Sequence, residues 1–153
     1  MKVLATNKKA YFNFQILEKF EGGISLTGQE VKSIKTSGVS LEGSYIIPKK
    51  NKKGKTEFFW VASHISPYQP ENVLSYHPKR ERKILFKKRE INYLLGKIKE
   101  RGLTLVPIRL YNKKGWLKLE IALAKGRKKR EKKEILKKRA IEKEIERTLK
   151  EKR

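Results

Sequence analysis

The residues that could carry chemistry in this chain are few. The sequence holds two histidines, His64 and His77, whose spacing matches no metal-binding motif. It has no cysteine and no aspartate, so a thiol nucleophile is excluded and a catalytic carboxylate pair would need two glutamates. It also lacks a Gly-x-x-x-x-Gly-Lys-Ser/Thr phosphate loop. We therefore expect no enzyme, no metal site and no cofactor.

Two acids stand out because they fall between predicted elements in a basic context. Glu21 and Glu30 could accept hydrogen bonds from the amino groups of bases, as glutamate does with cytosine. An internal ion pair with a nearby lysine is about as compatible with the spacing. Both interpretations stay open for each residue.

The strongest signal is the charge. The chain has 40 Lys+Arg against 16 Asp+Glu, a formal net charge of +24 over 153 residues. Residues 126–153 alone hold 14 basic and 6 acidic residues, so both the main part of the chain and its end share the excess. Positive charge of this density repels itself in a compact domain, and binding to a polyanion is the usual reason for it. We expect a nucleic acid as the partner.

Aromatic and basic residues are interleaved in three segments. These segments are 7–11, 64–68 and 77–83. Cations can contact phosphates while rings stack on unpaired bases. No recognition-helix or zinc-finger pattern for the major groove is present. The combination favours structured or single-stranded RNA over duplex DNA.

Two helices would help to position these residues. Thr27 and Glu30 have the spacing of a capping box, which predicts a short helix over 28–35. Apolar residues at i, i+3, i+4 and i+7 predict a longer helix over 88–101, with Gly102 as its C′ residue.

Strand patterns dominate the rest of the chain. Residues 117–124 alternate cleanly and should form a hairpin with 104–111. Gly22-Gly23 is expected to end or bend the first strand. The full set of expected strands is 11–17, 44–47, 57–62, 82–86, 104–111 and 117–124, with a basic turn at 49–55 and a proline-containing loop at 66–80. The predicted fold is mainly β: a small closed OB-like barrel of about six strands, with two or three short helices and a basic C-terminal tail.

The composition changes after Gly126. Residues 127–153 contain no glycine, proline or aromatic residue, and Ile141, Ile145 and Leu149 form only one narrow helical stripe. Such a segment buries too little surface to order itself. We predict an RNA-binding barrel over 1–125 and a tail over 126–153 that is disordered when free and helical on its partner. A helix docked on the barrel is the alternative.

Other features of the sequence indicate where the protein is expected to be in the cell. No apolar run approaches the roughly 20 residues of a membrane span, and residues 1–7 have no secretory h-region. The absence of cysteine is compatible with a reducing compartment, so we expect a cytoplasmic protein. High lysine and glutamate with a single methionine resemble thermophile usage.

Sequence blocks along nearly the whole chain match a known family. They are Asn7-Lys8-Lys9-Ala10, Phe20 to Ile24, Leu26 to Ser33, His64 to Tyr68, Pro78 to Leu85, Gly102 to Pro107 and Ala122 to Lys128. On these blocks the chain resembles the SmpB family, the small protein B or SsrA-binding proteins. The Gly-x-Glu-Val-Lys-Ser and Leu-Ala-Lys-Gly-Arg-Lys blocks are highly specific in combination.

The resemblance implies a function. The barrel would bind the tRNA-like domain of transfer-messenger RNA and deliver it to stalled ribosomes for trans-translation. It would substitute for the missing anticodon arm and help to place the resume codon. The tail would enter the empty mRNA channel of the decoding region as a helix. Elongation factor Tu would act indirectly, through the RNA.

The resemblance also implies site residues. Asn7, Lys8, Glu21 and Leu85 fall at RNA-contact positions. Further RNA-binding candidates near them are Lys9, Lys32, Ser33, Lys35, Tyr45, Arg80, Lys83, Lys125 and Lys128. The tail residues expected to contact the ribosome are Arg130, Glu131, Lys132, Lys133, Lys137, Lys138 and Arg139.

One departure and two alternatives remain. The family usually carries Asp-Lys-Arg where this chain has Glu131-Lys132-Lys133, and lysine cannot make the bidentate contact of arginine. Without the resemblance, a structural ribosomal protein with an OB barrel fits the same pattern. An RNA-modifying enzyme would need a cofactor motif that the sequence lacks.

Overall fold

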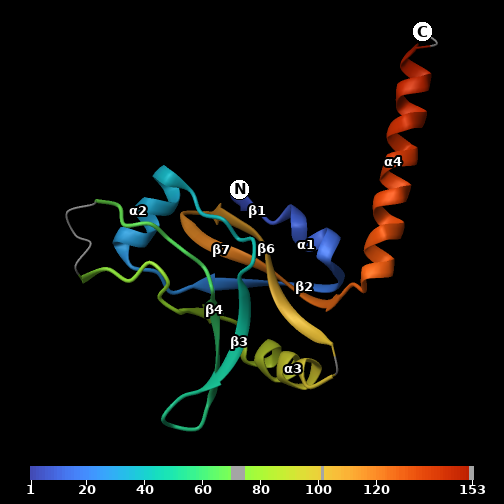
Figure 1. The fold of residues 1–153 in the computed structure, drawn as a ribbon. Coiled ribbons are helices and arrows are strands. Elements are labelled where there is room, and N and C mark those ends of the chain that lie inside the picture. Colours follow the sequence, from blue (N-terminus) through green and yellow to red (C-terminus); the bar gives the residue numbers. More distant parts are fainter. Residues whose placement is uncertain (70–74, 101, 152–153) are drawn as a thin grey trace.

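The computed structural model describes residues 1–69, 75–100 and 102–151. Within them the chain forms seven strands and four helices (Figure 1). The strands are β1 (Lys2–Thr6), β2 (Phe14–Ile24), β3 (Tyr45–Lys50), β4 (Thr56–Val61), β5 (Arg82–Leu85), β6 (Leu103–Lys113) and β7 (Trp116–Gly126). The helices are α1 (Lys8–Asn13), α2 (Gly28–Ser37), α3 (Lys88–Ile98) and α4 (Lys129–Glu151).

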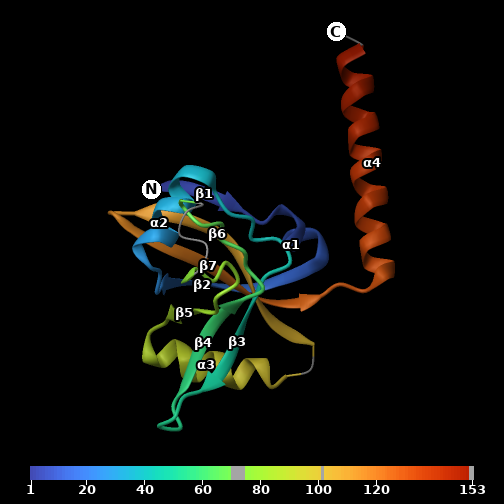
Figure 2. The same cartoon turned by 60° about the vertical axis from the view of Figure 1, so that its left-hand side comes forward.

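The strands form one antiparallel sheet that closes on itself. Their order is β1-β6-β3-β4-β5-β2-β7, and an additional pairing of β6 with β7 joins the ends of the six-stranded part into a ring. The strand β1 lies outside this ring, paired only with β6. The predicted closed barrel of about six strands is confirmed, and α1, α2 and α3 are its short helices (Figure 2).

The core fills the barrel and extends under two helices. Trp60, Leu119 and Ile121 are fully buried inside the ring, and Leu94 of α3 and Ile34 of α2 pack against the same cluster. The indole of Trp60 donates a hydrogen bond to the Ser44 hydroxyl at 2.8 Å, which satisfies its only polar group.

A smaller cluster joins α1 to the outside of the barrel. Ala10 packs on Val106, Ile108, Ala122 and Ala124 of β6 and β7. Because the β6–β7 face is covered there, this end of the hairpin is apolar on both sides.

The predicted helices are present, with one difference at an end. The Thr27 hydroxyl accepts from the Glu30 N–H and the Glu30 carboxylate accepts from the Thr27 N–H, so the capping box is confirmed at the start of α2. The stripe of α3 faces the core as expected, but this helix ends at Ile98. The prediction of Gly102 as its C′ residue is therefore wrong: Gly102, at φ +82°, lies in the turn before β6. Residue 101, where the helix was predicted to end, lies outside the described residues.

The N-terminal prediction is wrong in three respects. Residues 8–13 are helical, because the Asn7 side chain caps α1 by accepting from the Ala10 N–H at 3.2 Å. The strand β2 starts only at Phe14 and continues through Gly22-Gly23. A Cβ on Gly22 would lie 2.6 Å from Ile84 Cγ2, so glycine is needed there for close packing. Gly22-Gly23 does not end the strand, and the predicted bend stays a prediction. The strand β1 was not predicted at all.

The remaining strands agree with expectation to within three residues at each end. The segment 75–81 is irregular, as predicted for the loop 66–80, and residues 70–74 of that loop lie outside the described residues.

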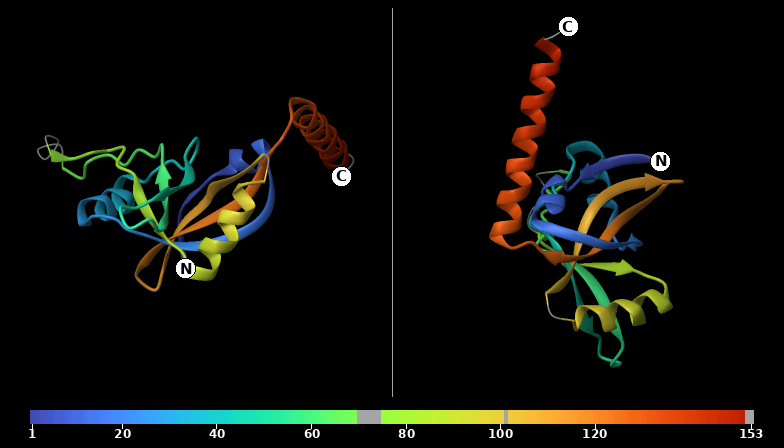
Figure 3. Two further views of the ribbon diagram at one scale, coloured as in Figure 1. Left: turned by 90° about the horizontal axis from the view of Figure 1, so that it is seen from below. Right: turned by 90° about the vertical axis from the view of Figure 1, so that its right-hand side faces the viewer.

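The C-terminal segment is a single helix, α4, that projects away from the barrel (Figure 3). None of its described side chains is buried, and Ile141, Ile145 and Leu149 are all more than half exposed. At its base the Arg127 side chain donates to the Phe14 carbonyl at 3.2 Å. Further along the helix, the Arg139 guanidinium lies 5.7 Å from the Phe12 ring. The alternative of a helix docked on the barrel stays open. Disorder of the free tail stays a prediction.

No described helix has the length and apolar character that crossing a bilayer requires.

Candidate nucleic-acid interface

A row of four residues crosses the outside of the barrel. Gly23 of β2 lies opposite Leu85 of β5 and opposite Lys118 of β7, and Lys118 lies opposite Tyr111 of β6. Residues directly opposite in an antiparallel sheet share a face, so the row is continuous over four strands. We call these residues, together with Glu21, the cross-strand row.

Gly23 leaves room for its two neighbours. A Cβ at this position would lie 3.4 Å from Leu85 Cβ and 3.8 Å from Lys118 Nζ, so both side chains extend over the glycine. Leu85 is 53% exposed. The row therefore offers an apolar contact beside an ammonium group.

Glu21 adds an acceptor to the same face. Its Oε2 accepts a hydrogen bond from the Tyr111 hydroxyl and lies 3.4 Å from Lys113 Nζ. The hydrogen bond from Tyr111 lowers the pKa of Glu21 below its usual value, while burial and this same bond raise the pKa of Tyr111. At neutral pH the pair is a carboxylate held by a neutral phenol. No donor from the described residues bonds Oε1, so that oxygen can accept from a ligand.

Glu30 has a different place. It is 1% exposed and pairs with Arg82 at 2.6 Å and with Arg80 at 2.5 Å. Burial alone would raise the pKa of Glu30, but the hydrogen bonds from Arg80, the Thr27 N–H and Arg82 outweigh it and the pKa is lowered. The interpretation of Glu30 as a base acceptor is wrong. The ion-pair alternative is correct in kind, with arginine partners in place of lysine.

Arg82 joins this pair to the loop before β5. It is fully buried, and it donates to Ser63 Oγ at 3.0 Å and to the Pro78 carbonyl at 2.9 Å. The Glu30–Arg82 pair thus fixes α2 to the segments 63–65 and 78–82.

Two of the predicted RNA contacts have buried side chains. Asn7 is 6% exposed, and its amide donates to the Pro107 carbonyl at 2.9 Å while its oxygen caps α1. Ser33, on α2, is fully buried. Both side chains support the positions of their elements and present no surface to a ligand in this structure.

The other predicted contacts are accessible but lie in separate places. Lys9 and Tyr45 line one hollow of about 360 Å³ between α1 and β3. Lys9 also pairs there with Glu42 at 2.8 Å. Lys32 and Lys35 are exposed on α2, where Lys32 Nζ lies 5.7 Å from the Tyr68 ring. The structure does not unite them with the cross-strand row.

The remaining candidates lie on the edges of the barrel or on α4. Lys83, beside Leu85, pairs with Glu57 at 2.5 Å. Lys8, Lys125 and Lys128 are exposed around the base of α4. On α4 itself the predicted ribosome contacts are exposed, except that Glu131 and Lys132 are half-buried. The full tail set is Arg130, Glu131, Lys132, Lys133, Lys137, Lys138 and Arg139.

Sequence reasoning missed Lys118, Lys113 and Tyr111. Lys118 belongs to the polar side of the alternating 117–124 strand, a signal that places it outward. Its position over Gly23 depends on the register of β2 against β7, which alternation does not reveal. Among the described residues no three His or Glu side chains gather as metal ligands.

Comparison with known proteins decides the family. The model of the SmpB protein family matches residues 4–151. The chain belongs to the SmpB family. An SsrA-binding protein of Sulfurihydrogenibium sp. (strain YO3AOP1) is 46% identical over 149 residues, which are 97% of this chain and 95% of that protein. An SsrA-binding protein of Thermosipho africanus (strain TCF52B) is 45% identical over 151 residues, 98% of each chain.

A solved structure supports the same family. It is described as "tmRNA-SmpB: a journey to the center of the bacterial ribosome". One of its chains matches with a TM-score of 0.65 and 36% identity, over 84% of this chain and 87% of that one. The resemblance to the SmpB family that the sequence blocks indicated is confirmed.

Proposed function

We propose that this protein binds the tRNA-like domain of transfer-messenger RNA and delivers it to stalled ribosomes for trans-translation. The names of its SmpB relatives and the subject of the matching solved structure support this function. The observation that carries the site is the cross-strand row, where Leu85 and Lys118 meet over Gly23 beside the Glu21 carboxylate.

The three side chains have complementary roles in this proposal. Lys118 contacts a phosphate, Leu85 packs on a base or ribose, and the free oxygen of Glu21 accepts from a base amino group. A carboxylate repels the phosphates of an RNA that does not supply that donor. Glu21 therefore contributes selectivity on a surface whose net charge would otherwise attract any RNA.

The tail acts separately from the barrel. Residues 126–153 carry a net charge of +8, and within them α4 extends away from the barrel (Figure 1). We propose that this segment is disordered in the free protein and enters the empty mRNA channel as a helix. Elongation factor Tu would meet the protein only through the RNA, in the cytoplasm, and the protein itself would make and break no covalent bond.

A competitive titration tests the proposal. Labelled tRNA-like domain is competed with an ordinary tRNA and a ribosomal RNA hairpin at two salt concentrations. We expect a preference for the tRNA-like domain that survives the higher salt. Lys118→Ala should weaken this preference, whereas Lys52→Ala, which removes the same charge from the exposed β3–β4 turn, should not.

The structural ribosomal protein is the competing function. It predicts equal affinities for the three RNAs, which fall together as salt rises because they reflect counterion release alone. It also predicts stoichiometric copurification with one ribosomal subunit. Either result would overturn the adaptor proposal.

A further inference from the structure

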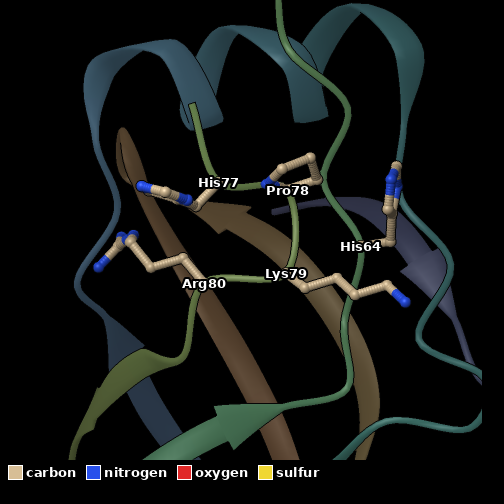
Figure 4. Close-up of a pocket in the computed structure, with 5 residues that line it drawn as sticks. All are labelled: His64, His77, Pro78, Lys79 and Arg80. Carbon is tan, nitrogen blue, oxygen red and sulfur yellow. The ribbon is translucent and has the colours of Figure 1, made fainter. Parts of the chain in front are cut away.

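A second basic hollow lies on the α2 side of the barrel, outside the cross-strand row. It measures about 580 Å³ and is lined by His64, His77, Pro78, Lys79 and Arg80 (Figure 4). His64 comes from the segment after β4, and the other four form one run before β5. We call it the histidine hollow.

The walls of the histidine hollow are held in place by hydrogen bonds. The Ile65 N–H donates to the Pro78 carbonyl at 3.0 Å, which ties the two segments together. Arg82 donates to the same carbonyl, and the Tyr76 hydroxyl donates to the Ile65 carbonyl at 2.6 Å. A hollow whose backbone is fixed in this way is preformed, so a ligand need not order it.

In the part of the chain that the structure describes, the lining of the hollow has basic side chains and no acid. The carboxylate of Glu30 is buried and already bound to Arg80 and Arg82. Among the described residues, no hydrogen bond or ion pair engages the side chains of His64, His77 or Lys79, and Arg80 Nε is buried without a partner. Arg80 is neutralised by Glu30, so an anionic group would find in Lys79 a lining cation that no described carboxylate neutralises.

The lining of the hollow also contains flat rings, which could stack on a base. The Pro78 ring lies between the His77 imidazole on one side and the His64 imidazole on the other (Figure 4), and all three residues line the hollow. Histidine rings are among the side chains on which unpaired bases stack. The volume lies within the range of small-ligand sites, and base and phosphate groups together match a ring surface edged with cations.

We propose that the histidine hollow binds one unpaired nucleotide of an RNA, with its base on the imidazole and proline rings and its phosphate on Lys79. The proposal rests on the RNA-binding function proposed above and adds a second, separate contact to it. The strand has room to continue, because a neighbouring hollow of about 740 Å³ shares His64 and another shares His77 and Arg80.

The first experiment uses the histidines as their own reporters. The chain has only these two, so every imidazole signal in an NMR spectrum of the full-length protein comes from the hollow. AMP, adenosine and inorganic phosphate are titrated separately to about 10 mM. We expect AMP to shift both imidazoles and the other two to shift them much less. Equal shifts by phosphate, or no shift by AMP, would overturn the nucleotide site.

The second experiment identifies which RNA supplies the nucleotide. The double variant His64→Ala/His77→Ala and the single variant Lys79→Ala are compared with wild type and with Lys52→Ala as the charge-matched control. Binding is measured to the tRNA-like domain and to isolated small ribosomal subunits. Because the double variant loses the rings on which a base would stack, its affinity for one of the two RNA partners should fall by roughly fivefold or more. The RNA that is affected is the source.

The outcomes separate the two proposals. Unchanged affinity of the double variant for both RNAs, with an intact near-UV spectrum, would overturn the histidine hollow and leave the adaptor function standing. A wild-type protein that shows no preference for the tRNA-like domain, yet whose imidazoles respond to AMP, would overturn the adaptor function instead.

Discussion

Replacing Glu30 by alanine tests whether the buried ion pair holds α2 to the barrel. The change leaves Arg82 fully buried with a positive charge and no carboxylate. Removing one partner of a buried pair costs about 3–5 kcal/mol, because the remaining charge stays desolvated. Domains of this size are stable by about 5–15 kcal/mol, so the variant should fold but lose a large share of its stability.

A surface pair provides the matched control. Glu57 and Lys83 lie 2.5 Å apart, as close as Glu30 and Arg80, but Lys83 is 45% exposed. Water and salt screen such a pair, so Glu57→Ala should leave stability within experimental error of wild type. The two variants thus compare equal geometry in different surroundings.

Urea unfolding followed by far-UV circular dichroism measures both variants. With a slope of about 2 kcal/mol per molar, a loss of about 4 kcal/mol lowers the midpoint by roughly 2 M. Glu30→Gln keeps the shape but not the charge and should fall between alanine and wild type. If Glu30→Ala lowers the midpoint no more than Glu57→Ala, burial of the pair does not matter and the reasoning is refuted.

Four further predictions can be checked with the same preparations. Because the pKa of Glu30 is lowered in the folded state, its ionised carboxylate contributes to the free energy of unfolding above the usual glutamate range, and this contribution is lost as pH falls through the folded-state pKa. The difference in free energy of unfolding between wild type and Glu30→Gln should therefore shrink below about pH 4. A difference that stays constant with pH would contradict this. Glu21→Ala should weaken binding of the tRNA-like domain in a two-salt titration although it makes the surface more positive, and tighter binding would show that Glu21 is only an electrostatic cost. Deletion of residues 127–153 should leave barrel unfolding and RNA binding intact but abolish peptide tagging on stalled ribosomes, and a truncated protein that still supports tagging would refute the assigned tail role. Gly22→Ala should lose about 1–3 kcal/mol in urea, because its Cβ would meet Ile84 at 2.6 Å, whereas Gly28→Ala, with open space at its Cβ, is the control.

The parts of the fold that follow from local patterning were predictable. The alternation of apolar and polar residues predicted the β6–β7 hairpin, and the capping box predicted the start of α2. The failures occurred where a distant contact decides the local structure. Asn7 caps the helix α1, which continues into the alternating stretch 11–17. Asn7 is held in place because its amide also donates to the Pro107 carbonyl, 100 positions away. Alternation over 11–17 could not show that anchor.

The candidate site divides in the same way. Glu21 and Leu85 were identified from family positions, but their meeting with Lys118 requires the register of three strands. Glu30 looked equivalent to Glu21 in the sequence, since both lie in basic surroundings. Only the fold reveals that one carboxylate faces outward and the other is enclosed by two arginines.

The pairing pattern also divides the barrel into two leaves. The strands β2, β7 and β6 share long ladders, as do β3 and β4, but a single residue pair, Ile46 with Leu105, joins β3 to β6. On the opposite side, β5 meets β2 through only two pairs, at Gly23 and Ile24.

These two narrow seams are where the barrel should open first, so amide hydrogens beside them should exchange faster than those within either leaf. An RNA that contacts Leu85 and Lys118 at once spans the β5–β2 seam. Binding of that RNA would hold the two leaves together, and the barrel would be mechanically stiffer with the RNA bound than without it.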